Sequence, residues 1–162
     1  MRELVSTVLE ALWIFLPILA ANQAGKLAKV LGLPFAYTLV SERWLGTNKM
    51  VASLYLGPLL GAATVLMFYR EPTNSFIGLW LGLGAVLGDY VKSVIKRLLE
   101  KPSGSPWWPD RIDFAIGGGL MALTIVPGVT WQHVVIIVLI AWPVHYFGNR
   151  WGHKRGWRST PW

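Results

Sequence analysis

Long apolar runs constrain this 162-residue chain more than any other feature of its sequence. Because a helix needs about 20 apolar residues to cross the hydrocarbon core of a membrane, such runs predict transmembrane helices. Only 14% of the residues are charged, whereas an average soluble domain carries about 25%. We therefore predict a single all-α integral membrane domain over residues 1–162, a bundle of five transmembrane helices. Their expected ranges are 4–21, 50–69, 76–101, 112–126 and 131–147.

The positive charge of the chain lies between and after these runs. The net charge is +7, and residues 22–49, residues 97–111 and the tail after Asn149 are basic. The turns expected at 70–75 and 127–130 carry little charge. Because basic loops tend to stay in the cytoplasm, we expect a multi-pass cell-membrane protein whose N-terminus faces outside. Charge confined to loops indicates orientation and anion binding, so no nucleic acid is expected as a partner.

A long cytoplasmic loop is expected after the first span, at residues 22–49. It is long for a connection, and loops of such length are usually functional or disordered. Its apolar piece, residues 31–40, is too short to cross a membrane. We expect this piece to be a re-entrant or interfacial segment that covers the functional site.

An acidic residue lies inside the third apolar run, where a charge needs an explanation. This residue, Asp89, is followed at steps of three and four residues by Lys92, Ser93 and Lys96. Such steps place all of them on one face of a helix. A carboxylate at membrane depth costs at least about 2.5 kcal/mol without a partner, which makes it a functional-site hypothesis. In the simpler alternative, Asp89 pairs with a lysine at the end of the span. Lys96 and Arg97 would then anchor the helix at the membrane edge.

Two further acids, Asp110 and Asp113, lie where the fourth run begins. As a helix N-cap and a first-turn acid, either would suit the positive end of the helix dipole. Together with Asp89, they place three carboxylates at one membrane face of a chain that has eight acidic residues in all. Mg²⁺ prefers such oxygen ligands, usually one or two carboxylates together with phosphate oxygens and water. We therefore predict a Mg²⁺ site at Asp89, Asp110 and Asp113.

Cations that could bind phosphate groups lie on the same side of the predicted bundle. They are Lys49, Lys92, Lys96, Arg97 and Arg111. Phosphoryl transfer requires positioning and charge neutralisation more than covalent chemistry. The sequence has no P-loop pattern, nucleophile elbow or Ser/His/Asp arrangement. A lipid phosphate monoester would need no general base, because it is already largely ionised at neutral pH.

Residues 88–114 read GDYVKSVIKRLLEKPSGSPWWPDRIDF. This stretch resembles the signature G-D-x-x-K-S-x-x-K-R-x-x-x-K-P-G … P-x-x-D-Q-x-D-F of the CDP-archaeol synthases. These are archaeal CTP-dependent cytidylyltransferases, membrane relatives of bacterial CDP-diacylglycerol synthase. Weaker similarity is found at residues 17–22, at His145 with Asn149, and at residues 161–162.

Two places depart from the family pattern. Arg111 stands where the family usually has Gln. Residues 46–49 look like the start of the family's G-x-x-K-T-x-R-G loop, and Lys49 matches its lysine. Residues 50–53 follow that lysine, and the arginine of the motif has no obvious counterpart among them.

The resemblance implies transfer of CMP from CTP to 2,3-di-O-geranylgeranylglyceryl phosphate, which forms CDP-archaeol and pyrophosphate in archaeal phospholipid biosynthesis. The partners would be CTP, this isoprenoid ether-lipid phosphate and membrane lipid. Mg²⁺ at Asp89, Asp110 and Asp113 would neutralise the leaving pyrophosphate. We expect Asp89, Lys92 and Lys96 to be catalytic. The expected nucleotide-binding residues are Asn22, Lys49, Lys92, Ser93, Lys96 and Arg97.

Two other functions remain open at this point. A small transporter or channel would place Asp89 and Lys92 along its pathway, since ionisable residues inside a membrane also mark such pathways. A CDP-alcohol phosphotransferase would use related substrates, but the D-G-x-x-A-R start of its motif is absent. If the chain is a synthase, we expect the lipid tails to lie in a groove between spans that is lined by small residues.

Overall fold

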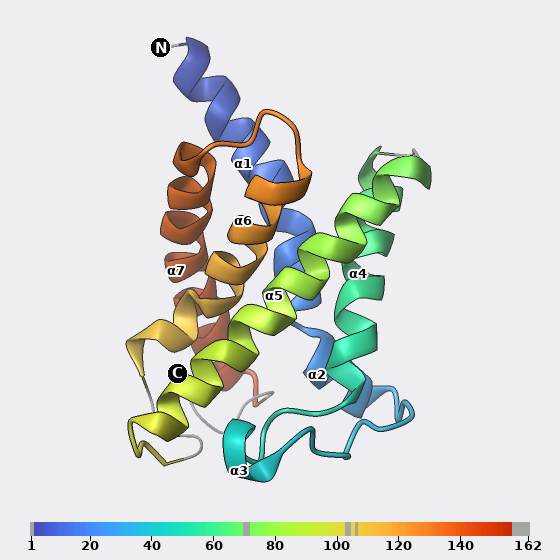
Figure 1. The fold of residues 1–162 in the computed structure, drawn as a ribbon, viewed down its shortest axis with the longest axis vertical. Coiled ribbons are helices and arrows are strands. Elements are labelled where there is room, and N and C mark those ends of the chain that lie inside the picture. The colour runs from blue at the N-terminus through green and yellow to red at the C-terminus, as the bar shows by residue number, and fades with distance from the viewer. Residues whose placement is uncertain (1, 70–71, 103–104, 106, 157–162) are drawn as a thin grey trace.

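The apolar runs form a helical bundle in the computed structural model (Figure 1), which describes residues 2–69, 72–102, 105 and 107–156. An isolated β-bridge joins Leu39 and Met50, and the described residues contain helices but no strand. The all-α prediction is therefore confirmed for this part of the chain. Each of the five predicted spans contains a helix. These are α1 (Arg2–Ala21), α4 (Ala52–Tyr69), α5 (Pro72–Leu98), α6 (Asp113–Ile125) and α7 (Trp131–Lys154).

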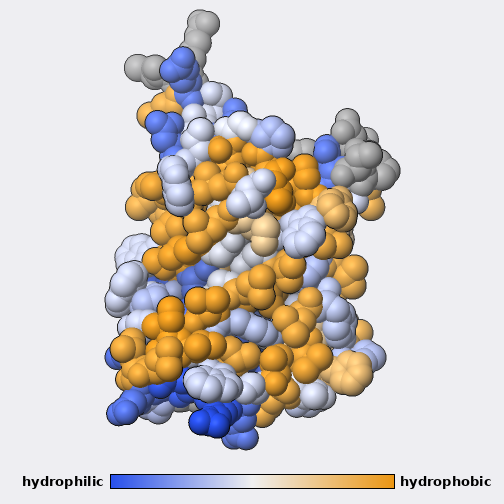
Figure 2. All heavy atoms as spheres, viewed as in Figure 1, coloured by the Kyte–Doolittle hydropathy of each residue, from blue (hydrophilic) through white to orange (hydrophobic). Residues whose placement is uncertain are grey.

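The helices have the composition of membrane spans. Three of them, α1, α5 and α7, are long and apolar enough to cross a membrane, while α4 and α6 are apolar but shorter. Large apolar side chains are exposed on the bundle, among them Leu9, Met67 and Leu139. Figure 2 shows apolar residues over the body of the molecule and hydrophilic residues gathered at its lower end. These features support a membrane protein, and the crossing of a membrane by all five helices stays a prediction.

The chain passes along the bundle so that its basic segments meet at one end. In Figure 1, α1 runs downward from the N-terminus, α4 and α6 run upward, and α5 and α7 run downward. Residues 22–49 and the described residues between 99 and 112 therefore lie at the lower end, whereas the turn at 126–130 lies at the upper end. The charge pattern predicts this grouping of connections. The membrane face to which each end belongs stays a prediction.

The segment 22–49 differs from the single long loop that the sequence predicts. It contains two short helices, α2 (Ala24–Val30) and α3 (Glu42–Leu45). Ala28 of α2 is fully buried and packs in a small cluster with Ala52 at the start of α4. The glycines and the proline of this segment suggest interruptions, but the tertiary packing of small side chains overrides that local preference.

The apolar piece at 31–40 forms turns with a well-fixed backbone. Phe35 has a φ of 60°, a left-handed conformation that is unusual for a bulky residue. The Tyr55 hydroxyl donates a hydrogen bond of 2.6 Å to the neighbouring Pro34 carbonyl oxygen. The side chains of Phe35 and Tyr37 are nevertheless exposed. A fixed turn with exposed aromatic rings suits an interfacial segment, and its place in a membrane stays a prediction.

Helix α5 ends at Leu98, three residues before its predicted end at Lys101. Glu100 has a φ of 56°, and the Lys101 N–H donates a hydrogen bond of 3.0 Å to a carbonyl oxygen in the last turn of the helix. This left-handed arrangement is a common way to end a helix. Residues 103–104 and 106 of the predicted Pro/Gly-rich turn lie outside the described residues.

Glycines bring α4, α5 and α6 into backbone contact. A Cβ atom on Gly61 of α4 would lie 2.1 Å from the carbonyl oxygen of Gly78 on α5. A Cβ atom on Gly84 of α5 would lie 2.8 Å from the carbonyl oxygen of Gly117 on α6. Small residues of this kind allow membrane helices to approach closely. These glycines therefore line contacts between helices, and the groove expected for the lipid tails stays a prediction.

Replacing Gly61 by Ala should destabilise the bundle, because the added methyl group must push α4 away from α5. Overpacking of this kind costs about 1–3 kcal/mol, which we expect to measure as a lower midpoint of thermal unfolding in detergent. The matched control is Gly148 of α7, where nothing lies within 4 Å of an added Cβ atom. Gly148→Ala should leave the midpoint unchanged or raise it, since Ala favours a helix more than Gly does. A Gly61→Ala midpoint equal to that of the unmodified protein would contradict the close contact.

Candidate active site

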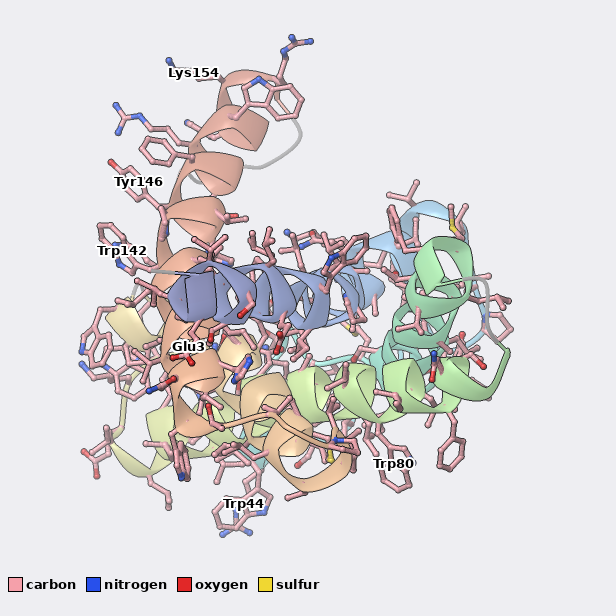
Figure 3. All side chains as sticks on the ribbon, turned by 90° about the horizontal axis from the view of Figure 1, so that it is seen from above. Glu3, Trp44, Trp80, Trp142, Tyr146 and Lys154 are labelled. Carbon is pink, nitrogen blue, oxygen red and sulfur yellow. The ribbon has the colours of Figure 1, made fainter. Side chains whose placement is uncertain are left out.

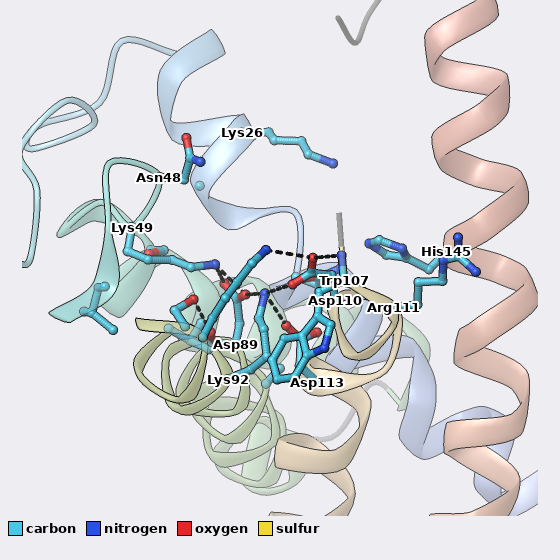
Figure 4. Close-up of a pocket in the computed structure, with 18 of the residues that line it drawn as sticks. Lys26, Asn48, Lys49, Asp89, Lys92, Trp107, Asp110, Arg111, Asp113 and His145 are labelled. Atoms are coloured by element: carbon cyan, nitrogen blue, oxygen red, sulfur yellow. Dashed lines mark hydrogen bonds and ion pairs between the residues drawn. The ribbon is translucent and has the colours of Figure 1, made fainter. Parts of the chain in front are cut away.

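The basic end of the bundle contains a pocket of about 800 Å³ (Figure 4). Its walls come from the end of α1, α2, the segment between α3 and α4, α5, the 3₁₀ turn η1 (Trp108–Arg111), the start of α6, and α7. Every residue that the sequence predicts for the site lines this pocket. These residues are Asn22, Lys49, Asp89, Lys92, Ser93, Lys96, Arg97, Asp110 and Asp113. The structure thus brings them together, and their chemical roles stay predictions.

A glycine and a helix start bring the acids of α5 and α6 together. Gly88 precedes Asp89, and a Cβ atom on it would lie 2.4 Å from the carbonyl oxygen of Asp113. Asp113 begins α6, and its Oδ1 accepts a hydrogen bond of 2.7 Å from the Phe114 N–H. The first-turn position expected for Asp113 is therefore present. The same position places its carboxylate next to Asp89 and Lys92 of α5.

Asp110 connects the η1 turn to α5. Its Oδ2 accepts a hydrogen bond of 3.0 Å from the Trp107 N–H, so it has a local capping role similar to the one that the sequence suggests. Its Oδ1 lies 2.7 Å from the Nζ of Lys92, and its Oδ2 lies 3.2 Å from the Nζ of Lys96. Local capping and long-range ion pairing are therefore both present, and neither excludes the other.

Lys92 lies at the centre of the acids. Its Nζ is 3.3 Å from Asp89, 2.7 Å from Asp110 and 2.9 Å from Asp113, measured to the nearest carboxylate oxygen. The Lys92 side chain is only 14% exposed, so water screens these charges weakly. The described residues contain no group of three or more acidic, His or Cys side chains arranged to hold a metal ion. The ammonium group of Lys92 instead links the three carboxylates.

Lys49 ties the segment between α3 and α4 to α5. Its ammonium group donates hydrogen bonds to both carboxylate oxygens of Asp89. Nearby, the Tyr90 hydroxyl donates a hydrogen bond of 2.9 Å to the Met50 carbonyl oxygen and lies 2.7 Å from the Ser53 Oγ. The loop that departs from the family motif is thus firmly attached to α5. Sequence analysis missed Tyr90, because no pattern distinguishes it from the other aromatic residues of the span.

Two neighbouring basic residues of α5 have different environments. Lys96 is buried, pairs with Asp110, and donates a hydrogen bond to the Ser105 carbonyl oxygen. The simpler alternative has Asp89 paired with a lysine, and Lys92 lies 3.3 Å from it, whereas the role of Lys96 as a membrane-edge anchor stays untested. The Nε of Arg97 is buried and has no hydrogen-bond partner among the described residues. Because an unsatisfied buried donor is costly, an anion in the pocket would be bound favourably at Arg97.

The pocket carries more positive than negative charge. Three carboxylates line it, together with seven basic side chains, and such an excess favours a polyanion. The basic residues are Lys26, Lys29, Lys49, Lys92, Lys96, Arg97 and Arg111. Sequence analysis assigned no role to Lys26 and Lys29. Their spacing of three residues would place them on one helix face, but α2 itself was not predicted.

Comparison with known proteins reveals similarity along the whole chain. A family model described as CarS-like, CDP-archaeol synthase, matches residues 4–162. A CDP-archaeol synthase of Thermococcus onnurineus (strain NA1) is 29% identical over 170 residues, which cover 98% of this chain and 99% of that protein. A CDP-archaeol synthase of Pyrococcus furiosus is 29% identical over 167 residues, which cover 96% of this chain and 98% of that protein.

A further relative matches over part of the chain. A CDP-archaeol synthase of Methanoculleus marisnigri is 32% identical over 108 residues, which cover 62% of this chain and 65% of that protein. No solved structure matches the chain significantly. The family match includes residues 161–162, which lie outside the part of the chain that the structure describes. Because the family model spans nearly the entire sequence, the chain belongs to the CarS-like family of CDP-archaeol synthases.

Proposed function

We propose that this protein transfers CMP from CTP to an ether-lipid phosphate and releases pyrophosphate, forming CDP-archaeol in archaeal phospholipid biosynthesis. The observation that carries the proposal is the excess of basic side chains in a pocket at one end of an apolar bundle. CTP is a soluble polyanion, whereas a lipid phosphate is an anion attached to membrane-soluble chains. A cationic pocket at the end of membrane-type helices suits both substrates. We propose 2,3-di-O-geranylgeranylglyceryl phosphate as the acceptor.

The reaction exchanges one phosphoanhydride bond for another. A phosphate oxygen of the lipid attacks the α-phosphorus of CTP and forms the new P–O bond. The bond from the α-phosphorus to the oxygen that bridges to the β-phosphate breaks, and pyrophosphate leaves with that electron pair. Since the attacking phosphate is already ionised, the pocket does not need a general base. Its residues act by positioning the two anions and by neutralising their charge.

We propose a Mg²⁺ ion as the cofactor that binds the acids of this pocket. Three carboxylates, Asp89, Asp110 and Asp113, already approach a single cation, the ammonium group of Lys92. Their oxygens are the ligand type that Mg²⁺ prefers. When bound, the ion would neutralise charge on the triphosphate and on the leaving pyrophosphate. We propose that these three residues hold the ion and that Lys92 then contacts substrate phosphates.

The remaining predicted residues surround this group of acids. We propose that Lys49, Lys96 and Arg97 bind the triphosphate, supported by their positions in the pocket wall. Ser93 donates a hydrogen bond of 2.8 Å from its Oγ to the Asp89 carbonyl oxygen, which fixes its side chain. We propose that Ser93 and Asn22 provide polar contacts to the nucleotide.

We further propose that all five apolar helices cross the cell membrane, with the N-terminus outside and the pocket facing the cytoplasm, where CTP is available. The basic segments at the pocket end support this orientation through the positive-inside rule. Membership of a synthase family favours this function over a transporter, a channel or a CDP-alcohol phosphotransferase.

Removing one carboxylate should nearly abolish the reaction. We expect Asp89→Asn, Asp110→Asn and Asp113→Asn each to lower the rate of Mg²⁺-dependent pyrophosphate release by at least about a hundredfold. The assay combines the purified protein in detergent with labelled CTP, Mg²⁺ and the lipid phosphate. Glu100→Gln is the matched control, because Glu100 is an exposed acid just beyond α5 that does not line the pocket.

The unfolding midpoint of each variant separates lost chemistry from lost structure, since each carboxylate also pairs with a lysine. Full turnover in one of the three variants would remove that residue from the proposed metal site. If the unmodified protein releases no pyrophosphate with any lipid phosphate, the proposed function itself is wrong.

Arg97→Met should weaken CTP binding without weakening the fold. The buried Nε of Arg97 lacks a partner among the described residues, so its loss removes no protein hydrogen bond of that atom. We expect the KM for CTP to rise about tenfold, as for the loss of a charge-assisted hydrogen bond, while the unfolding midpoint stays equal or rises. An unchanged KM for CTP together with a lower midpoint would instead show that Arg97 has only a structural role.

A further inference from the structure

One side of the pocket contains polar groups that the proposed mechanism does not use. Arg111 of η1 and His145 and Asn149 of α7 line this side. We infer that it binds the phosphate group of the lipid acceptor, with Arg111 as the cation that holds it. This inference rests on the proposed cytidylyl transfer and extends it by assigning separate sites to the two substrates.

Arg111 forms no ion pair with a carboxylate among the residues that the structure describes. Its guanidinium carbon lies 5.2 Å from the ring centroid of Tyr146 and 5.9 Å from that of Trp142. These two rings are stacked, with centroids 6.0 Å apart and an angle of 8° between their planes. Among the described residues, the ion pairs of the pocket acids involve only lysines. Aromatic faces hold a guanidinium in place and leave its N–H groups able to bind an anion.

The geometry of the reaction requires an anion site opposite the leaving group. In phosphoryl transfer the attacking and leaving oxygens lie roughly in line on either side of the phosphorus. In Figure 4, Lys49 lies on one side of the carboxylates, whereas Arg111 and His145 lie on the other. With the pyrophosphate end of CTP on the lysine side, the incoming phosphate must approach from the Arg111 side.

Helix α7 also has exposed apolar side chains, which suit the chains of a lipid and are not needed to bind a nucleotide. Large apolar side chains are exposed on α7 at Trp142, which lies beside Arg111, and at Phe147, whose ring contacts that of Tyr146. Figure 3 shows Trp142 and Tyr146 projecting from the same side of α7, and the end of this helix, at Lys154, standing clear of the other helices. The apolar chains of the acceptor can lie along this surface while its phosphate enters the pocket.

Two polar residues of α7 are fixed beside this entrance. The Nδ2 of Asn149 lies 3.1 Å from the Nδ1 of His145, and Asn149 is buried. The His145 ring packs against the fully buried Phe114 ring, with centroids 5.9 Å apart. This packing fixes the orientation of the His145 ring, so that its polar edge can face the phosphate group.

Replacing Arg111 by Met tests the inference, because Met keeps an apolar stem against the two rings and removes the charge. We expect Arg111→Met to raise the KM for 2,3-di-O-geranylgeranylglyceryl phosphate about tenfold, the loss of one charge-assisted contact, with the KM for CTP unchanged. Arg111→Gln should give a smaller increase, since an amide still donates a hydrogen bond. Both variants are measured as the full chain by pyrophosphate release, with each substrate varied in turn.

Arg155→Met is the matched control, because Arg155 makes the same kind of contact with Trp151 but does not line the pocket. It should leave both KM values unchanged.

A rise in the KM for CTP alone in Arg111→Met would overturn the inference and place the nucleoside on this side. An equal rise in both KM values with a lower unfolding midpoint would also overturn it, because Arg111 would then only hold α7 in place. An inactive unmodified protein would contradict the proposed reaction, whereas an active protein with unchanged Arg111→Met kinetics would contradict only the acceptor site.

Discussion

The ammonium group of Lys92 is the contact on which the arrangement of this pocket depends. It reaches carboxylates from three different elements, α5, η1 and α6, at distances between 2.7 and 3.3 Å. Three acids so close together repel one another strongly in a weakly screened site. Lys49 and Lys96 add a second cation to Asp89 and Asp110, so three lysines balance three acids. Among the described residues, Arg97 and Arg111 form no ion pair with these three acids. We therefore propose that they are the cations best suited to bind the incoming phosphates.

Backbone packing makes that arrangement possible before any ion pair forms. Gly88 touches the first residue of α6, so α5 and α6 meet where each carries an acid. The Asp110 carboxylate is fixed by the Trp107 N–H within its own turn, and it therefore points toward α5. Breaking a buried ion pair on one side leaves a charge uncompensated, which typically costs about 3–5 kcal/mol. The ion pairs of the pocket therefore also hold the lower end of the bundle together.

The sequence predicts those parts of the structure that depend on spacing along one helix. The apolar runs indicate the five helices of the bundle, and the three- and four-residue steps after Asp89 place Lys92 and Lys96 on its face. Contacts between elements could not be predicted in the same way. Nothing in the sequence shows that Lys92, rather than Lys96, lies among all three acids. The helix α2 was missed because its stability comes from the packing of Ala28 and not from local propensity. Likewise, the sequence does not show that the stacked rings of Trp142 and Tyr146 lie beside Arg111, because α7 is remote from Arg111 along the chain.

The glycine contacts have a consequence for how the bundle responds to the surrounding lipid. Helices whose backbones are already in contact cannot come closer together. Helices separated by bulky side chains can change their distance when those side chains change rotamer. If the bundle spans a bilayer as proposed, we expect α4, α5 and α6 to move as one block when lateral pressure changes with temperature or lipid chain length. The least buried of the long helices is α7, and it must absorb most of the adjustment. The spacing of the carboxylates would then not depend on the physical state of the membrane, whereas the position of the pocket wall formed by α7 would change with it.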